Sequence, residues 1–277
     1  MYTREEIIQA NREVHTAIGD RYLDEPHYRP ENQARVREIL KSLQEQTRGT
    51  SLLDVGCGMG FIIDLAKDYF RTIRGVDVTS AMLEKVCLHG GPDCDIQVKF
   101  DLVETLSFPD NSFDVCTAHA LLHHLCDIRP ALAEIYRVLK PGGIFYSDLD
   151  PNAYFWDAII SLNLDGDYND IIHREIIAVR DKDQEIAEQF SVNVKAVQQA
   201  EYLKHCQGGF REKDLLSHLK EARFARYEVK YQWFLGEAQI IHGETTKGSA
   251  SNLRAYLQNM LPLTKHLFKY LMIFAKK

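Results

Sequence analysis

The feature that most constrains the fold is a glycine-rich segment, residues 52–66, which reads LLDVGCGMGFIIDLA. An apolar run ends in an acid, three glycines follow at alternate positions, and an apolar pattern with helical spacing comes next. This order predicts a strand, a tight turn and a helix, the unit with which an open parallel sheet binds nucleotide-like ligands at its carboxyl edge. Glycine lacks a Cβ, so it permits unusual backbone angles and a close approach of the ligand.

The same rhythm of strand and helix continues through the first half of the chain. Strands are predicted at residues 51–55, 72–78, 95–101, 113–119 and 144–148. A helix is expected over residues 80–86, with Thr79 or Ser80 as its N-cap, and another over 129–139, ended by the sequence KPGG. Strands that alternate with helices imply an α/β fold with a doubly wound, mostly parallel sheet covered on both faces.

The remaining chain is predicted to be mostly helical. Residues 1–45 form a helical N-terminal cap, and within it Tyr22 either lines a pocket or lies on the surface. Residues 151–209 are too long for a connection within the sheet, so we expect a helical lid insertion after the fifth strand. A helix and two further strands follow, at residues 212–222, 227–234 and 268–275, with a second helical excursion over 237–266. We treat residues 1–277 as one domain.

Composition limits the partners and the location of the chain. The formal net charge of -7 gives no basic field, so no nucleic-acid partner is expected. The N-terminus lacks the apolar region of a signal peptide, and no apolar run is long enough for a membrane span. The six cysteines include no C-x-x-C pair, which favours buried free thiols in a reducing compartment. We therefore expect a cytoplasmic protein without a membrane partner and leave its oligomeric state open.

Three details of the glycine-rich segment indicate which ligand it binds. Phe61 occupies the place of the third glycine in G-x-G-x-x-G, which argues against a pyrophosphate. Asp54 would repel phosphate but can pair with an ammonium group, although it could instead cap the following helix. Asp77 ends the second strand, where a carboxylate can accept hydrogen bonds from both ribose hydroxyls. A ligand with a ribose, an ammonium and no phosphate points to S-adenosylmethionine.

These residues carry a family resemblance. The sequence DVGCGMG at residues 54–60 resembles the first motif of class I S-adenosylmethionine-dependent methyltransferases, and GVDV at 75–78 resembles their ribose-binding acid. FDL at 100–102 is similar to the adenine-contacting segment, and residues 112–119 and 133–143 are similar to the stretches around strands four and five. The resemblance, to the type 11 small-molecule branch, is specific over residues 50–150 and loose over 210–277.

The resemblance implies a seven-stranded sheet with an antiparallel last strand, S-adenosylmethionine as cofactor and S-adenosylhomocysteine as product. The residues expected to bind the cofactor are Tyr22, Asp54, Gly56, Cys57, Gly58, Gly60, Asp77, Val78, Asp101, Leu102, Ala118 and His119. Asp101 could instead only cap a helix, and Cys57 is more simply a small turn residue than a nucleophile.

The candidate catalytic residues follow the fourth strand. Methyl transfer is an in-line displacement that depends largely on positioning, and a base is needed only when the nucleophile must lose a proton. His123 and His124 are the candidate bases, with a structural or pocket-lining role as the alternative. His119 and His123 lie four residues apart, but the E-x-x-E-H pattern that binds metal in some relatives lacks both carboxylates here. No metal is therefore expected.

The sequence predicts S-adenosylmethionine-dependent methyl transfer to a small, partly apolar metabolite. Tyr154, Phe155 and Trp156, at the start of the insertion, either line an apolar pocket for it or dock the insertion on the sheet. Two other functions stay open. One is a catalytically inactive regulatory protein that binds S-adenosylmethionine or S-adenosylhomocysteine, and the other is a dinucleotide-dependent oxidoreductase, which Phe61 and Asp54 oppose.

Overall fold

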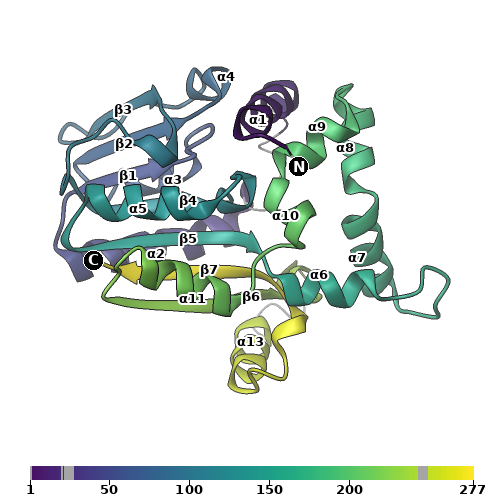
Figure 1. Cartoon of the computed structure of the whole chain (residues 1–277). Coiled ribbons are helices and arrows are strands. Elements are labelled where there is room, and N and C mark those ends of the chain that lie inside the picture. Colours follow the sequence, from purple (N-terminus) through teal and green to yellow (C-terminus); the bar gives the residue numbers. More distant parts are fainter. Residues whose placement is uncertain (1, 20, 22–27, 243–248) are drawn as a thin grey trace.

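The computed structural model describes residues 2–19, 21, 28–242 and 249–277, and its core is one seven-stranded sheet of order β3-β2-β1-β4-β5-β7-β6 (Figure 1). The strands are β1 Ser51–Val55, β2 Thr72–Asp77, β3 Asp95–Phe100, β4 Phe113–His119, β5 Leu139–Pro151, β6 Arg226–Phe234 and β7 Phe268–Lys276. β1 to β5 pair in parallel, whereas β7 runs antiparallel to both β5 and β6. The predicted α/β fold with an antiparallel last strand is confirmed.

Helices cover both faces of the sheet. They are α1 Arg4–Ile18, α2 Pro30–Thr47, α3 Phe61–Ala66, α4 Ser80–Leu83, α5 Ile128–Val138, α6 Ala153–Ile160, α7 Asp170–Arg180, α8 Lys182–Phe190, α9 Val194–Ala200, α10 Tyr202–Gln207, α11 Glu212–Glu221, α12 Glu237–His242 and α13 Ser249–Asn259, with short 3-10 turns η3 Val103–Thr105, η4 Leu122–His124 and η5 Lys265–Leu267. The apolar sides of α2 and α3 pack on one face, and those of α5 and α11 pack on the other.

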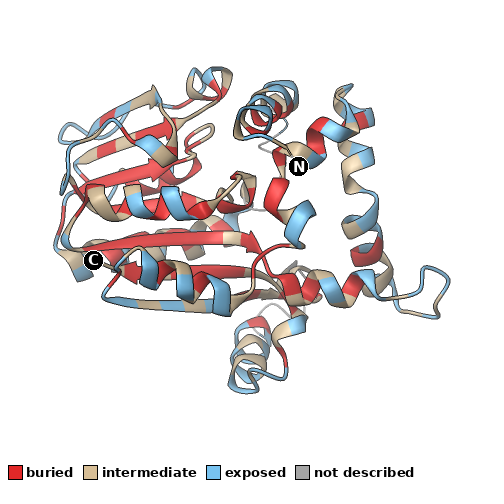
Figure 2. Ribbon diagram, in the orientation of Figure 1, coloured by how far each residue is buried: buried red, intermediate tan, exposed pale blue. Residues whose placement is uncertain are grey.

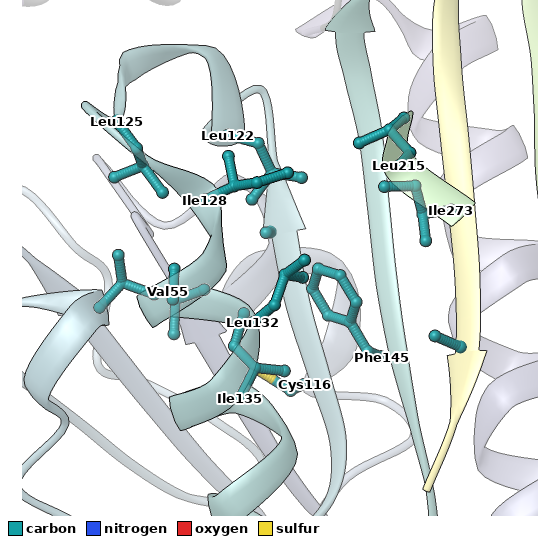
Figure 3. Close-up of a cluster of buried hydrophobic side chains, with 14 of the residues drawn as sticks. Val55, Cys116, Leu122, Leu125, Ile128, Leu132, Ile135, Phe145, Leu215 and Ile273 are labelled. Atoms are coloured by element: carbon teal, nitrogen blue, oxygen red, sulfur yellow. The ribbon is translucent and has the colours of Figure 1, made fainter. Parts of the chain in front are cut away.

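The central strands are buried on both faces, as a covered parallel sheet requires (Figure 2). In Figure 3, Leu132 and Ile135 of α5 lie close to Phe145 of β5, with Cys116 of β4 beside them. Such a packed core fixes the carboxyl ends of β1, β2 and β4 relative to one another, and the predicted site residues lie at these ends.

Helices α6 to α10 follow β5, and Figure 1 shows α7 and α8 standing away from the sheet. Apolar residues of α1 pack against α8 and α9, in a small cluster that includes Val14 and Val197. The N-terminal helix and the helices after β5 therefore meet each other beside the sheet.

The structure corrects three details of the sequence interpretation. The KPGG segment ends helix α5 as expected, but it lies inside β5 as a bulge, because the register passes from Phe113 opposite Leu139 to Val115 opposite Ile144. Helix α4 ends at Leu83 and not at residue 86, since Val86 turns inward and packs beside Gly60. All six cysteines are free thiols, but only Cys57 and Cys116 are buried.

Candidate active site

The glycine turn between β1 and α3 is built from residues with positive φ. Gly56 has φ +66° and Gly60 has φ +90°, and both values fall in the left-handed region that favours glycine. A Cβ on Gly56 would lie 2.4 Å from Leu121 Cδ1, and one on Gly60 would lie 2.9 Å from Val86 Cγ1. A Cβ on Gly58 would meet no atom within 4 Å. The turn therefore packs tightly at its two ends and is open at its centre.

Asp77 joins this turn to the end of β2. Its Oδ2 accepts a hydrogen bond of 2.9 Å from the Gly58 N–H, and its Oδ1 accepts one of 2.8 Å from the Thr79 N–H. The Thr79 hydroxyl is buried in the same place, and it has no hydrogen-bond partner in the part of the chain that the structure describes. A ribose hydroxyl fits beside this orphaned polar atom and the adjacent carboxylate.

These groups lie on the wall of a cavity that contains about 830 Å³ of empty space, which we call the first cavity. Its wall is formed by the glycine turn, the ends of β2, β3 and β4, and one side of α1. The residues on it include Arg4, Ile7, Asn11, His15, Gly56, Gly58, Asp77, Val78, Thr79, Asp101, Leu102, His119, Ala120, Leu121 and His124.

The structure brings most of the predicted cofactor residues to this cavity. Gly56, Gly58, Asp77, Val78, Asp101, Leu102 and His119 lie on its wall. Asp54, Cys57, Gly60 and Ala118 belong to the surrounding turn and strands and are not among the residues that line it. Tyr22 lies outside the described residues, so its predicted role stays a prediction.

Asp54 is buried at 2% exposure in β1, where the Thr117 hydroxyl donates a 2.7 Å hydrogen bond to its carboxylate. Burial raises the pKa of Asp54 to about 7, and the charge of Asp77 acts in the same direction. The N-cap of α3 is Gly60, so the alternative in which Asp54 caps this helix is wrong. Asp54 is therefore poised to gain or lose a proton near neutral pH.

Asp101 follows β3 directly and organises the loop after it. Its carboxylate accepts hydrogen bonds from the Leu102 N–H, at 3.0 Å, and from both the N–H and the hydroxyl of Ser107. Burial acts to raise its pKa, but these bonds outweigh burial, so the pKa of Asp101 is lower than usual. It is thus a charged group on the cavity wall.

His119 ends β4, and its ring lies against Phe61, with 4.9 Å between the ring centroids. Burial, assisted by the positive charge of Arg35, lowers the pKa of His119 to about 3. The imidazole is therefore neutral at physiological pH. Phe61 occupies the place of the third glycine in the dinucleotide-binding pattern, and its ring packs against both His119 and Tyr28.

A second cavity, with about 1420 Å³ of empty space, adjoins the first. The two share His15, Ala120 and His124 on their walls. Ala120 has φ +53°, an uncommon value for a residue with a Cβ, and its N–H donates to the Asp148 carbonyl at 2.8 Å. The backbone is thus strained at the point where the cavities meet.

The walls of the second cavity come from α1, η4, the end of β5, the helices α6 to α10 and β7. The lining residues include Val14, Ile18, His123, Leu149, Phe155, Trp156, Glu175, Val179, Lys182, Ile186, Val197, Glu201, Lys204, Lys269 and Tyr270. Both interpretations of the aromatic run hold: Phe155 and Trp156 line this cavity, and Tyr154 packs against the main hydrophobic core that the sheet contributes to.

The two candidate bases lie on η4 between the cavities and have different partners. His123 Nδ1 lies 2.9 Å from Oδ1 of buried Asp150, and His124 Nδ1 lies 2.7 Å from the Ala200 carbonyl oxygen. The two rings are 4.2 Å apart between centroids, and His15 of α1 lies 5.1 Å from His124. Burial lowers the pKa of His124 far below its usual value, and the two neighbouring histidines add to this effect.

Sequence reasoning missed His15, Thr79 and Asp150. A signal for His15 was present, because Asn11 and His15 interrupt the apolar face of α1 with polar side chains. Asn11 uses this position to donate to the His124 carbonyl at 3.3 Å. Asp150 carried no comparable signal, since its contact with His123 depends on where β5 ends.

Residues 53–147 match the family described as "Methyltransferase domain". The match begins at the glycine turn, includes Asp77, Asp101 and both η4 histidines, and ends in β5. Residues 53–147 are a methyltransferase domain. It is of the class I type, and its methyl donor is S-adenosylmethionine.

Curated relatives resemble the methyltransferase domain and name different acceptors. A 2-methyl-6-phytyl-1,4-hydroquinone methyltransferase from Synechocystis is 38% identical over 97 residues, 35% of this chain and 30% of the relative. A phosphoethanolamine N-methyltransferase from Caenorhabditis elegans is 31% identical over 109 residues, 38% of this chain and 25% of the relative. The chain thus matches less than a third of the length of these relatives.

The fold recurs in solved structures. An S-adenosylmethionine-dependent methyltransferase from Mesorhizobium loti superposes with a TM-score of 0.54 at 18% identity, over 87% of this chain and 96% of that one. At this identity the likeness concerns the fold alone. The first cavity lies mainly on the methyltransferase domain, whereas most of the second cavity lies outside residues 53–147.

The described residues include neither a metal-binding cluster nor a membrane-spanning helix. No three of their His, Cys, Asp and Glu side chains are grouped so that they could hold a metal ion. None of their helices has the length and apolar character needed to cross a membrane.

Proposed function

We propose that this protein transfers a methyl group from S-adenosylmethionine to a small, partly apolar metabolite. The observation that carries the proposal is the pair of adjoining cavities, one lined by the residues expected at the donor and the other by apolar and aromatic side chains. In this arrangement the donor lies in the first cavity and the acceptor in the second, and they meet at Ala120 and His124.

The first cavity suits the three parts of the donor. Asp77 and the Thr79 hydroxyl would bind the ribose, and Asp101 and Leu102 would contact the adenine. Gly56 and Gly58 would lie against the methionine portion, with Asp54 compensating its ammonium from beneath the turn. Cys57, Gly60, Ala118 and His119 would shape the site, and Tyr22 keeps its predicted place beside the cofactor.

The helices outside the methyltransferase domain would enclose both ligands. Residues 1–45 would act as a cap and residues 151–209 as a lid, within one domain of 277 residues. Side chains of α1 line both cavities, and side chains of α6 to α10 line the second. Enclosure would hold the acceptor in line with the methyl–sulfur bond, and such positioning can supply much of the rate enhancement.

The acceptor's identity does not follow from the relatives. A hydroquinone and a phosphoethanolamine differ in charge and shape, yet proteins named for each show similar identity to this chain. His123 and His124 are the candidate bases for an acceptor that must lose a proton. A cytoplasmic location and a small-molecule partner, with no nucleic acid, remain predictions from composition.

Calorimetry followed by a transfer assay tests the proposal. We expect micromolar binding of S-adenosylmethionine and S-adenosylhomocysteine without binding of NAD(H), and transfer of labelled methyl to compounds of an acceptor panel. Binding of NAD(H) alone would identify an oxidoreductase. Tight binding of S-adenosylhomocysteine without turnover on any panel or cell extract would identify a regulatory protein instead.

A further inference from the structure

The structure narrows the chemical class of the acceptor in the methyl transfer proposed above. This inference rests on that proposed function. We infer that the acceptor atom is a hydroxyl oxygen of a neutral, largely apolar compound such as a phenol or enol. His123 takes the hydroxyl proton, and Asp150 is the residue that positions His123. None of the family motifs includes Asp150, which lies beyond the methyltransferase domain.

The geometry of Asp150 is that of an orienting group. One oxygen accepts from the His123 backbone N–H at 3.2 Å and lies 2.9 Å from His123 Nδ1, and the other accepts from the Ser147 hydroxyl at 2.6 Å. Asp150 and Ser147 are 1% and 0% exposed. The carboxylate therefore selects the tautomer with the hydrogen on Nδ1, leaves Nε2 to accept a proton, and stabilises the imidazolium that forms.

The neighbouring His124 lacks this support. Its Nδ1 lies against the neutral carbonyl of Ala200, and burial and the adjacent histidines lower its pKa far below the usual value. Glu201 acts in the opposite direction on His124, but this carboxylate is paired with Lys204 and does not outweigh burial and the two histidines. Its neutral ring, on the walls of both cavities, is suited to position the acceptor rather than to take its proton.

The charges of the second cavity disfavour a cationic acceptor. Its two wall carboxylates are each paired with a lysine: Glu175 with Lys269 at 2.5 Å, and Glu201 with Lys204. An ammonium acceptor would therefore find no unpaired carboxylate on the described part of this wall. Val14, Ile18, Val179, Ile186 and Val197 supply apolar surface for the rest of the molecule.

A hydroxyl oxygen must lose its proton to accept the methyl group, so it needs a general base such as His123. A carboxylate acceptor is already ionised at neutral pH, whereas a phenol, with a pKa of about 10, is not. In the step, the O–H bond breaks as His123 Nε2 takes the proton, and an oxygen lone pair forms the new O–CH3 bond. The methyl–sulfur bond breaks with its electrons remaining on sulfur, so the products are the methyl ether, S-adenosylhomocysteine and imidazolium, which returns its proton to solvent.

The first test needs no substrate. In the intact protein labelled with 15N-histidine, we expect the His123 nitrogens to show hydrogen on Nδ1, and Asp150→Asn to move that hydrogen to Nε2 in part of the molecules, because the amide NH2 can donate to Nδ1. His89→Gln, at an exposed position, serves for assignment and as the matched control. The same His123 tautomer in Asp150→Asn as in wild type would overturn the positioning role.

The second test compares two phenols with labelled donor at pH 8: a nitro-substituted phenol that is largely ionised, and an alkyl-substituted phenol that is not. We expect His123→Gln to lower kcat/KM for the alkylphenol about 100-fold or more, and that for the nitrophenolate far less. Asp150→Asn should show the same selectivity with a smaller loss, and His89→Gln should show none.

The outcomes separate this inference from the proposed function. Equal losses on both phenols in His123→Gln would overturn the base assignment. A wild-type protein that binds S-adenosylhomocysteine but methylates only amines, thiols or carboxylates, or no phenol, would overturn the hydroxyl assignment. Failure to bind S-adenosylhomocysteine at all would instead overturn the proposed function.

Discussion

The two cavities differ in how the chain builds them. The first takes most of its wall from short segments that directly follow β1, β2, β3 and β4, together with one helix, α1. The second takes its wall from α1, η4, the end of β5, five helices after it, and β7. A ligand site at strand ends is thus encoded locally, whereas a site between packed helices depends on the whole fold.

The walls of the two cavities also differ in their chemistry. The first cavity relies on backbone groups and on glycines, as in the N–H bonds that Gly58 and Thr79 donate to Asp77. The second relies on side chains such as Trp156 and on lysine–carboxylate pairs. Substitutions should therefore separate donor binding from acceptor binding, and the following experiments test that separation.

The largest effect is expected from Asp77→Ala. The variant loses the carboxylate that would bind the ribose and that also holds the Gly58 and Thr79 N–H groups. Two charge-assisted hydrogen bonds contribute about 3 kcal/mol, so Kd for S-adenosylhomocysteine should rise roughly 100-fold by calorimetry. Asp68→Ala, at an exposed position, is the control. Equal affinities for Asp77→Ala and wild type would show that the ribose lies elsewhere.

A smaller and more selective effect is expected from Trp156→Ala. The indole lines the second cavity, and Lys204 Nζ lies 5.0 Å from its ring centroid. Loss of this surface should raise KM about tenfold for the phenol that wild type methylates fastest, as expected for about 1.4 kcal/mol of contact energy. Kd for S-adenosylhomocysteine should stay within about twofold, since apolar contacts act over short range. Tyr256→Ala, exposed on α13, is the control. If Trp156→Ala also weakened binding of S-adenosylhomocysteine, donor and acceptor binding would not be separable in this way.

The third effect concerns the stability of the fold and depends on Asp54, which is buried below the glycine turn. Burial raises the pKa of Asp54 from 3.8 to about 7, so between these pH values the folded protein holds a proton that the unfolded chain has released. Stability from this group is therefore present at acid pH and is lost as pH rises toward 7. Asp54→Asn removes the titration, so its Tm should exceed that of wild type at pH 8, by about 2–4 °C for each kcal/mol of stability gained.

Thermal melts of Asp54→Asn and wild type at pH 4.5 and pH 8 measure this difference. The gain should shrink at pH 4.5, where the folded wild type is already protonated at this position. Asp68→Asn, with an exposed side chain, should show no pH-dependent difference. A gain of equal size at both pH values would mean that Asp54 is not the titrating group.

The sequence predicted the strands of the sheet better than the elements that depend on packing. The limits of β1 and β4 agree with the prediction, because each is a compact apolar run bounded by polar or turn residues. The early end of α4 was missed, since it follows from the burial of Val86 beside Gly60. The bulge in β5 was missed as well, since the KPGG sequence is equally typical of a turn outside a sheet.

The candidate site likewise contains residues that the sequence could place and residues that only packing brings together. Gly56, Gly58, Asp77 and Asp101 could be placed from sequence because the ends of neighbouring parallel strands meet at one edge. The contact between His123 and Asp150 joins residues 27 positions apart, and it forms only because β5 extends to Pro151 beside η4.

By itself, the sequence determined the α/β fold, the turn and the methyl donor, because strand periodicity, glycine conformation and strand-end acids act over a few residues. Only the tertiary structure decided which side chains line the second cavity, which histidine has a carboxylate partner, and that Asp54 is buried enough to titrate near neutral pH. These properties depend on distance and burial, and both arise when α1 and the helices after β5 pack at one edge of the sheet.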